Sequence, residues 1–279
     1  MPELAEVESY RKLWDAGVGQ RVLRVALHAG KRPLRDLDPP GVTGAIEGST
    51  LLGSEARAKQ MLFRFGHRGK ASAWLGIHLG MSGELRVEAA TFAPAKHDHL
   101  VLFQRQQALV FSDPRMFGRI RFHEGPAAPA WWTSMPPAVA SEAFTLDLVQ
   151  EALARRKGST VKGVLLMQDT FPGVGNWMAD EILWRARINP RRLCGELEQQ
   201  EIKSLWRETR EVCRIALETV GSGSPDPPAG WFFHVRWTSR GKCPRCGKSI
   251  ETATIAGRTT RWCAKCQPLP RAAARRRAK

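Results

Sequence analysis

The first ten residues of the chain, MPELAEVESY, place a proline and three carboxylates close together. If the initiator methionine is removed, Pro2 carries a secondary amine, which titrates well below a lysine side chain and can attack carbon at pH 7. Glu3 and Glu6 lie one helical turn apart, a spacing at which two carboxylates can share acid and base work. The same residues also suit an ordinary helix start, because proline fits the first turn and acidic groups favour the helix dipole. For Glu8 we adopt this structural interpretation.

Four cysteines near the end of the sequence form two Cys-x2-Cys pairs separated by sixteen residues. A β-hairpin between the pairs would bring four thiolates around one ion, the closed tetrahedral arrangement of a structural zinc site. The predicted ligands are Cys243, Cys246, Cys263 and Cys266. Because sulfur fills every position, water has no access to the metal, and the sequence predicts one Zn²⁺ with a structural role. Cys194 and Cys213 are interpreted as buried apolar residues.

A glycine-rich turn, PGVG at residues 172–175, precedes a helix predicted to begin at Asn176. Glycines let backbone N–H groups approach a phosphate, and a helix N-terminus adds the positive end of its dipole. Arg258, in the GRTT turn of the cysteine hairpin, is a second rigidly presented group. A generic helix hairpin and a solvated turn arginine are the alternatives, and these two elements alone do not decide between them.

The charge of the chain favours a polyanionic partner. Its 279 residues include 43 Lys+Arg and 27 Asp+Glu, for a net charge of +16. This excess favours nucleic acid over a membrane surface, or over a charge with no partner. No apolar stretch approaches the ~18 residues of a membrane span, and the acidic N-terminal segment is not a signal peptide. We therefore expect a cytoplasmic protein, in the bacterial cytosol or nucleoid, with no membrane partner.

The periodicity of the sequence predicts an α+β multidomain protein. Apolar residues at three- and four-residue spacing predict a helix over 2–18, and alternating segments between turn residues predict strands from about 21 to 123. Together they predict an N-terminal β-sandwich domain over 2–125. Residues 126–140 are predicted to be a linker, because the segment GPAAPAWWTSMPP is too rich in proline for a regular element.

Helical periodicity returns after this linker. A helical domain is predicted over 141–230, with helices at about 145–155, 159–168, 176–187 and 197–220. The cysteine hairpin makes a zinc-finger module over 231–267. The tail, 268–279, is basic and has no apolar face, so we expect it to be disordered and to hold nucleic acid non-specifically.

Three features occur together in one order: Pro-Glu at the N-terminus, a glycine-turn helix hairpin with Asn at the helix start, and a four-cysteine hairpin containing Gly-Arg-x-Thr. In this combination the chain resembles the formamidopyrimidine-DNA glycosylase and endonuclease VIII family of base-excision repair enzymes over about residues 2–267. The resemblance implies a β-sandwich, a helix-two-turn-helix domain and a zinc finger. It also implies that the amine of Pro2 attacks C1′ of the damaged nucleotide, forms a Schiff base, expels the base and cleaves the strand by β,δ-elimination.

The resemblance assigns further roles to residues at matching positions. Glu3 would serve the sugar oxygen and the proton transfers, with Glu6 in support, and Lys59 in ARAKQMLFRF would meet the lesion phosphate. The loops HLGMSGEL and DPRMFGR would fill the space left by the flipped nucleotide. Further DNA contacts are implied for Met81, Arg115, Phe117, Lys162, Asn176, Arg258 and His97. Without the resemblance, Lys59 would be read as a solvated charge, and Met81 and Phe117 as core residues.

The chain departs from the family pattern at three places. Ala5 replaces a common proline and touches no chemistry, whereas Met178 replaces a common tyrosine, so that a polar contact to the lesion is lost. The segment 221–237, GSGSPDPPAGWFFHVRW, is shorter than the loop that caps the flipped base in 8-oxoguanine-specific members. A broader or oxidised-pyrimidine preference is therefore expected.

We predict a monomeric bifunctional DNA glycosylase and AP lyase whose partner is damaged double-stranded DNA. One alternative is a catalytically inactive lesion- or DNA-structure-binding protein of the same fold. For this alternative the discriminating feature would be loss of Pro2 or Glu3, and both residues are present. A zinc-finger module of transcription is a third possibility, but it gives no reason for the N-terminal signature.

Overall fold

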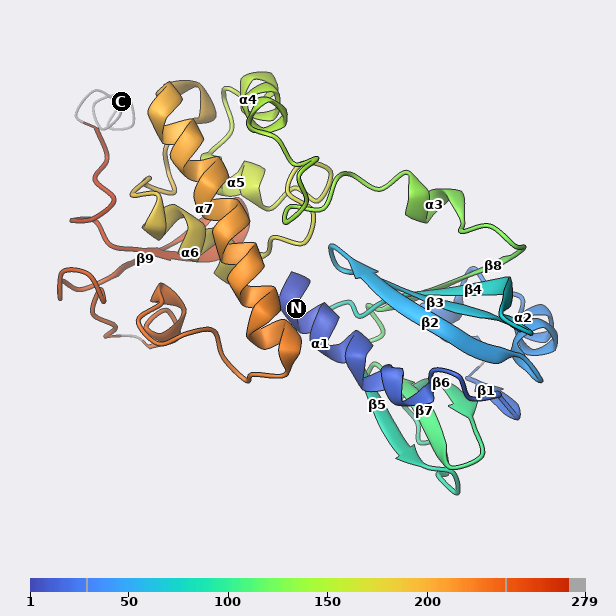
Figure 1. The fold of residues 1–279 in the computed structure, drawn as a ribbon. Coiled ribbons are helices and arrows are strands. Elements are labelled where there is room, and N and C mark those ends of the chain that lie inside the picture. Colours follow the sequence, from blue (N-terminus) through green and yellow to red (C-terminus); the bar gives the residue numbers. More distant parts are fainter. Residues whose placement is uncertain (29, 239, 271–279) are drawn as a thin grey trace. The chain divides into compact units, whose positions relative to one another are not determined.

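The computed structural model describes residues 1–28, 30–238 and 240–270. Most of the predicted tail, residues 271–279, lies outside this part of the chain. The chain forms two compact units, Met1–Met135 and Pro136–Lys279. The fold is α+β, as predicted: antiparallel strands predominate in the first unit and helices in the second (Figure 1).

The first unit is a sandwich of two four-stranded antiparallel sheets. One sheet has the order β2-β3-β4-β8 and the other β1-β6-β7-β5. The strands are β1 (Arg24–Leu27), β2 (Thr50–Arg57), β3 (Gln60–His67), β4 (Lys70–His78), β5 (Glu84–Ala89), β6 (Asp98–Phe103), β7 (Gln107–Ser112) and β8 (Arg119–Glu124). Alternating apolar residues of both sheets, among them Phe63, Leu75 and Phe111, form one buried core.

Helix α1 (Leu4–Leu13) continues into a 3₁₀ turn at Trp14–Gly17. It begins two residues later than predicted, with Glu3 as its N-cap, so Pro2 lies before the helix and not in its first turn. A second helix, α2 (Pro39–Ile46), lies within the region expected to contain only strands. Its start could have been read from Asp-Pro-Pro, since Asp38 accepts a hydrogen bond from the Gly41 N–H at 3.1 Å and proline occupies the first turn.

The proline-rich segment also contains a regular element, contrary to our expectation. Helix α3 (Ala130–Thr133) carries Trp131 and Trp132, and Trp132 packs with Leu62 and Trp74 on the sheet that contains β3 and β4. Two large apolar side chains thus anchor this segment despite its prolines, because their burial outweighs the poor helix propensity.

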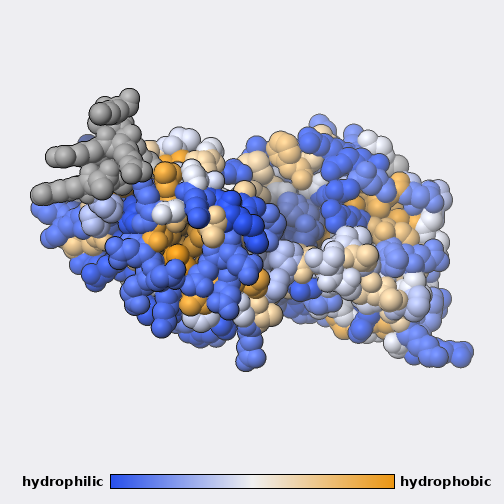
Figure 2. All heavy atoms as spheres, turned by 90° about the horizontal axis from the view of Figure 1, so that it is seen from above, coloured by the Kyte–Doolittle hydropathy of each residue, from blue (hydrophilic) through white to orange (hydrophobic). Residues whose placement is uncertain are grey.

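The second unit contains helices and a small hairpin. Its elements are α4 (Leu146–Arg155), α5 (Val161–Leu165), α6 (Asn176–Arg185), α7 (Gln199–Glu218), β9 (Glu251–Ile255) and β10 (Arg258–Trp262). The predicted helices therefore exist, and α5 is the one whose length was most overestimated. Among the described residues, no helix combines the length and the apolar character that crossing a membrane requires. Figure 2 shows hydrophilic side chains over most of the visible face, with apolar residues in separate small patches.

Candidate functional site

The N-terminal turn brings the two predicted catalytic carboxylates together. Glu3 is 4% exposed, and its backbone N–H donates to Oε2 of Glu6 at 3.2 Å. This contact is the half of a capping box in which a side chain reaches back to the helix start. Pro2 is half-buried beside them, while Met1 is exposed. Glu6 therefore fixes the backbone on which Pro2 and Glu3 stand.

Helix α1 and the 3₁₀ turn that follows it are hydrogen-bonded to both sheets, and these bonds hold the N-terminal turn of Pro2 and Glu3 in place. Trp14 is fully buried, and its indole N–H donates to the carbonyl of Arg86 in β5 at 3.2 Å. The Arg11 guanidinium donates to Oγ of Ser54 in β2 at 2.6 Å, and it also pairs with Glu8 at 2.9 Å. Packing and directional polar bonds thus hold the helix in one register.

Lys59 lies in the two-residue turn between β2 and β3 and is buried. The residue before it, Ala58, has a positive φ of 55°, a conformation that L-residues with a Cβ adopt at a cost. Burial, and then the positive charges of Lys59 and Arg121, lower the pKa of His78 at the end of β4. The ammonium of Lys59 is therefore close enough to this imidazole to influence its titration, and His78 is neutral at pH 7.

The two loops predicted to enter DNA pack against each other. Gly80 has φ +66°, and a Cβ added there would lie 2.4 Å from the carbonyl carbon of Phe117. Only glycine permits this approach. Asp113, fully buried, accepts hydrogen bonds from Ser82 Oγ at 2.7 Å and from the Gly118 N–H at 2.6 Å. One carboxylate therefore joins residues 78–85 to residues 113–119.

This pair of loops presents an apolar and cationic tip. Met81 is 39% exposed and Phe117 is 44% exposed, which excludes the interpretation of both as core residues. Arg115 is also exposed, and its guanidinium carbon lies 5.2 Å from the centre of the Phe117 ring. Met116, between them, has a positive φ of 56°. The arrangement offers apolar wedges with one hydrogen-bonding cation between them.

His97 supports the base of the same loop through its backbone. Its carbonyl accepts hydrogen bonds from the Asp113 N–H at 3.0 Å and from Ser112 Oγ at 3.1 Å, and its ring is half-exposed. His99 lies in the core with a ring nitrogen 3.0 Å from the Asp113 carbonyl. Burial lowers the pKa of His99. The half-exposed ring of His97 is accessible for a phosphate contact, whereas the buried ring of His99 supports the backbone at Asp113.

In the second unit the structure brings Asn176 to the hairpin that carries Arg258. The Asn176 side-chain N–H₂ donates to the carbonyl of Thr259 at 2.8 Å, while its Oδ1 is buried without a hydrogen-bond partner among the described residues. The Arg258 guanidinium is exposed and forms neither a hydrogen bond nor an ion pair within the described part of the chain. Residues 82 positions apart in sequence thus present polar groups from adjoining segments.

Lys162 does not lie where we expected it. The prediction of a direct phosphate contact does not fit the structure, because its side chain is 0% exposed and its ammonium pairs with Asp180 at 2.5 Å. The same ammonium donates to the Asn176 carbonyl at 2.8 Å. A lysine near a helix start can serve a phosphate or the helix itself, and only the packing of α5 against α6 distinguishes the two.

The four cysteines meet at one point, as the spacing predicted. Their sulfur atoms all lie within 4.8 Å of one another, with Cys243 to Cys266 at 3.8 Å and Cys246 to Cys263 at 3.5 Å. A tetrahedral ion with Zn–S bonds of about 2.3 Å requires sulfur separations of about 3.8 Å. The donor set fits one structural zinc ion.

Helix α6 supports this metal site directly. The Trp184 indole N–H donates to Cys243 Sγ at 3.3 Å, and Phe232 stacks on the Trp184 ring at 5.8 Å. Burial would raise the pKa of Cys243, but the bonds from Trp184 and from backbone N–H groups lower it to about 7. A thiol that ionises near neutral pH is suited to a metal.

Sequence reasoning missed several supporting residues, chiefly Asp113, Asp180 and His78. The signal for Asp180 was present, because WMADEILW places two carboxylates in a helix that is apolar on every side, and such helices are buried. A buried carboxylate must find partners. The identity of those partners could not be read from the sequence.

Comparison with known families gives three matches in order along the chain. The formamidopyrimidine-DNA glycosylase N-terminal domain matches residues 1–120, the formamidopyrimidine-DNA glycosylase H2TH domain residues 135–227, and the zinc finger found in FPG and IleRS residues 241–269. The formamidopyrimidine-DNA glycosylases of Xanthomonas euvesicatoria pv. vesicatoria and Xanthomonas campestris pv. campestris (strain B100) are 35% and 36% identical to the chain over 278 residues. Each match covers 96% of this chain and 100% of the relative.

Solved structures show the same similarity. The Lactococcus lactis formamidopyrimidine-DNA glycosylase bound non-covalently to DNA with an AP site has a TM-score of 0.83 and 27% identity. The complex of that enzyme with DNA containing an oxidised pyrimidine has a TM-score of 0.84 and 27% identity. Both comparisons cover 96% of this chain and 100% of the other.

Proposed function

The chain belongs to the formamidopyrimidine-DNA glycosylase family, and from this membership we propose that it is a bifunctional base-excision repair enzyme. It removes oxidised bases from double-stranded DNA and then cleaves the strand as an AP lyase. The N-terminal turn carries this proposal, because Pro2, the buried Glu3 and the Glu6 bond to the Glu3 backbone supply a nucleophile, a proton-transfer group and a support. The exposed Met1 must first be removed, since an acylated Pro2 has no nucleophilic lone pair.

The proposed chemistry starts at the amine of Pro2. Its lone pair forms a bond to C1′ as the glycosidic bond breaks and the base leaves with a proton. The nitrogen then loses its own proton, and its lone pair expels O4′ from C1′; the sugar ring opens, O4′ takes a proton, and the product is an iminium ion. Glu3 transfers protons to and from the sugar. Elimination of the C2′ proton then breaks the 3′ C–O bond, a second elimination breaks the 5′ C–O bond, and water hydrolyses the remaining imine.

DNA binding uses groups from both units. Met81, Phe117 and Arg115 fill the space that the flipped nucleotide leaves, and their exposure supports this role. Lys59, Asn176 and Arg258 contact phosphates beside the lesion, and His97 contributes a further contact. Zinc bound at the four cysteines cross-links the hairpin that presents Arg258 and supplies no reactive group.

The preferred lesion follows from the segment between α7 and the zinc module. Residues 221–237 begin within one short 3₁₀ turn, Val220–Ser222, contain a second, Phe232–His234, and are otherwise irregular. We propose that this short segment leaves the flipped base less enclosed, so that oxidised pyrimidines are accepted beside purine lesions. Excision from matched duplexes carrying 8-oxoguanine, formamidopyrimidine or an oxidised pyrimidine, each opposite different bases, tests this preference.

Borohydride trapping tests the central proposal. Protein with a free Pro2 is incubated with a duplex bearing an abasic site and sodium borohydride, which reduces the iminium to a stable amine. We expect a covalent protein–DNA adduct. The matched control is the same chain with an uncleaved N-terminal extension, in which Pro2 is an amide; it should bind the duplex without forming the adduct. An equal yield from both proteins would show that Pro2 is not the nucleophile.

The same experiment addresses the alternative of a catalytically inactive lesion-binding protein. Tight binding of abasic DNA with no adduct and no strand cleavage would favour it. The presence of both Pro2 and Glu3 argues against this alternative, because loss of one of them is the feature expected of an inactive protein of this fold. We further propose that the enzyme acts as a monomer in the cytoplasm.

A further inference from the structure

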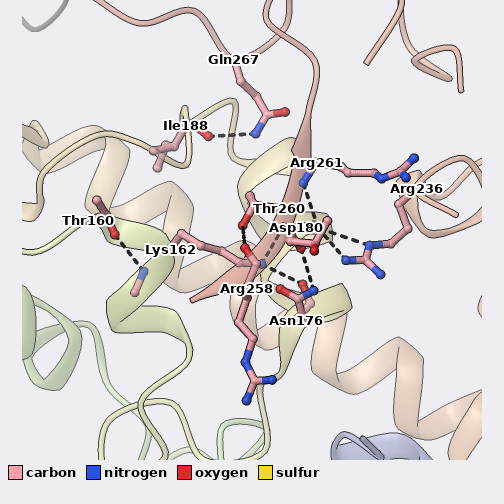
Figure 3. A network of polar contacts seen from close by, with 12 residues as sticks. Thr160, Lys162, Asn176, Asp180, Ile188, Arg236, Arg258, Thr260, Arg261 and Gln267 are labelled. Atoms are coloured by element: carbon pink, nitrogen blue, oxygen red, sulfur yellow. Dashed lines mark hydrogen bonds and ion pairs between the residues drawn. The ribbon is translucent and has the colours of Figure 1, made fainter. Parts of the chain in front are cut away.

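A buried carboxylate in the second unit joins four segments of the chain. Asp180 lies in the middle of α6 and is 1% exposed. Figure 3 shows it between the side chains of Lys162 and Arg236, with the backbone of β10 beside it at Arg261. Its Oδ1 accepts from Lys162, and its Oδ2 accepts from Arg236 and from the Arg261 N–H.

The first branch of this network leads to Asn176. Lys162 Nζ lies 2.5 Å from Asp180 Oδ1 and donates to the Asn176 carbonyl at 2.8 Å. Asn176 is the first residue of α6, so the Lys162 ammonium fixes the start of this helix by binding its first carbonyl group. The Asn176 side chain has few alternative positions, because its amide is also bonded to the Thr259 carbonyl at 2.8 Å.

The second branch leads to the strand that starts at Arg258. The Arg261 N–H donates to Asp180 Oδ2 at 3.3 Å, and this holds β10 against α6. The hairpin tip is fixed as well, because a Cβ at Gly163 in α5 would lie only 3.3 Å from the Cβ of Ala256. Both ends of the Arg258 turn are therefore constrained by contacts with α5 and α6.

The third branch holds the segment after α7. Arg236 is 5% exposed and donates to Asp180 Oδ2 through Nε at 3.2 Å and through Nη2 at 2.8 Å. The next residue of α6, Glu181, accepts from the Phe233 N–H at 3.1 Å. Burial raises the pKa of Glu181, although bonds from Arg185 and the backbone act against it. Consecutive carboxylates thus fasten residues 232–236 to α6.

We propose that Asp180 and Lys162 form a positioning pair that makes Asn176 and Arg258 one preorganised phosphate-binding unit. This inference rests on the proposed function, in which these two residues contact phosphates. In a site of low dielectric the charges strengthen each other and tolerate little movement, so the pair fixes the two groups before DNA arrives. Lys162 then acts through Asn176 and does not itself touch DNA.

A double-mutant cycle on DNA binding tests the pair. The variants are K162M, N176A and K162M/N176A, measured with a duplex carrying a stable abasic analogue over a series of salt concentrations. K162M leaves Asp180 paired with Arg236, so the buried carboxylate keeps one ionic partner. The matched control is K203M, which removes the same charge from an exposed position of α7. Zinc content and thermal unfolding establish that each variant is folded.

We expect K162M to weaken binding about tenfold, a loss of the size caused by one hydrogen bond to a charged group. The double variant should bind like N176A, because both changes remove one contact. The salt dependence should stay as in the unmodified protein, whereas loss of a direct phosphate contact would lower the slope of log K against log salt by about 0.9. K203M should leave the affinity at the abasic analogue unchanged.

Additive effects of K162M and N176A, or a slope reduced by about 0.9, would overturn the proposal in favour of a direct contact. An N176A variant that binds DNA normally would overturn the proposal too, because Asn176 would then make no phosphate contact for Lys162 to position. Borohydride trapping could still succeed in that case, so the proposed enzyme activity would hold even though this inference fails. If K162M does not fold, K162Q, which removes the same charge but keeps a polar side chain next to Asp180, replaces it in the same cycle with the same criteria.

Discussion

At the scale of single residues, the proposed mechanism assigns nucleophilic attack to Pro2 and proton transfer to Glu3. Pro2 stands outside α1, whereas Glu3 caps the helix and is nearly excluded from water. A carboxylate in this position can exchange protons with a bound sugar, while the helix behind it does not move. The two residues should therefore fail in different ways when they are changed.

We predict that E3Q slows base excision by about 10²–10⁴-fold, the usual contribution of a positioned acid–base group. Trapping on a preformed abasic site should persist, since Pro2 is intact. Single-turnover excision and borohydride trapping measure the two steps. E8Q is the control, because Glu8 pairs with Arg11 and serves the helix; its excision rate should be unchanged. If E3Q lost excision and trapping to the same extent, this would contradict the assignment of separate roles to Pro2 and Glu3.

His78 makes the stability of the first unit depend on pH. Its folded-state pKa is lowered by burial and by Lys59 and Arg121, so the unfolded chain binds a proton at higher pH than the folded protein does. Stability then rises with pH through this window and falls as the pH drops below about 6.5, the ordinary value for histidine. The unfolding temperature should decrease between pH 7.5 and pH 5.5.

The control for this pH dependence is H78N. Asn Oδ1 can replace His78 Nδ1 as the acceptor of the Gly80 N–H, which now lies at 3.1 Å, but the amide does not titrate. Thermal unfolding at matched ionic strength should show a smaller pH dependence for the variant. Identical slopes for the two proteins would mean that His78 titrates normally in the folded state.

At the scale of elements, the two loops proposed to enter DNA form one structure because Asp113 joins them. Loops usually move independently of the elements that they connect, but here the carboxylate is bonded to Ser82, Gly118 and the Arg115 backbone. Non-glycine residues with positive φ lie beside candidate contacts: Ala58 before Lys59, and Met116 before Phe117. Strain at these sites is maintained by the sheets beneath them.

We predict that D113N destabilises the first unit by about 1–3 kcal/mol, because an amide cannot satisfy donors at both oxygens. Lesion excision should fall as well, since Met81 and Phe117 would no longer enter DNA together. S82A removes one of the bonds and should cost about 1 kcal/mol or less. Urea unfolding and excision kinetics check both variants. Equal effects of D113N and S82A would show that Asp113 does not act beyond the Ser82 bond.

For the whole molecule, the two units have separate cores and depend differently on zinc. The core of the first unit contains none of the cysteine ligands, whereas Trp184 and Phe232 pack around Cys243 and Cys263. The hairpin between the cysteine pairs is short and has few apolar contacts of its own, as in small domains that need a metal to fold.

We predict that a strong chelator removes one zinc ion per chain and abolishes DNA binding, because Arg258 loses its support. The first unit should keep its fold, visible as a retained unfolding transition. Metal analysis, calorimetry and a binding assay follow these changes, and added Zn²⁺ should restore binding. The control C194S alters a buried cysteine outside the site and should retain the metal. If chelation abolished the unfolding transitions of both units, the first unit would depend on zinc, contrary to the prediction.

The sequence alone determined the order of the strand-rich region, the helical region and the cysteine hairpin, and the site motifs that are local. Two Cys-x2-Cys pairs indicate one four-sulfur metal site, and MPELAEVESY places Pro2, Glu3 and Glu6 within about one helical turn. Periodicity located α6 and α7 closely, because helices depend on contacts between neighbours in sequence. Periodicity missed α3, whose two tryptophans pack against a sheet that is distant in sequence.

Only the tertiary structure decided what the charged residues do. Lys162 was predicted to contact a phosphate and is buried against Asp180, and Asp113, to which we had assigned no role, joins two loops. The physical reason is that the role of a charge depends on its solvation and on partners distant in the chain. Local spacing fixes which groups are available, and packing fixes which of them face water, DNA or each other.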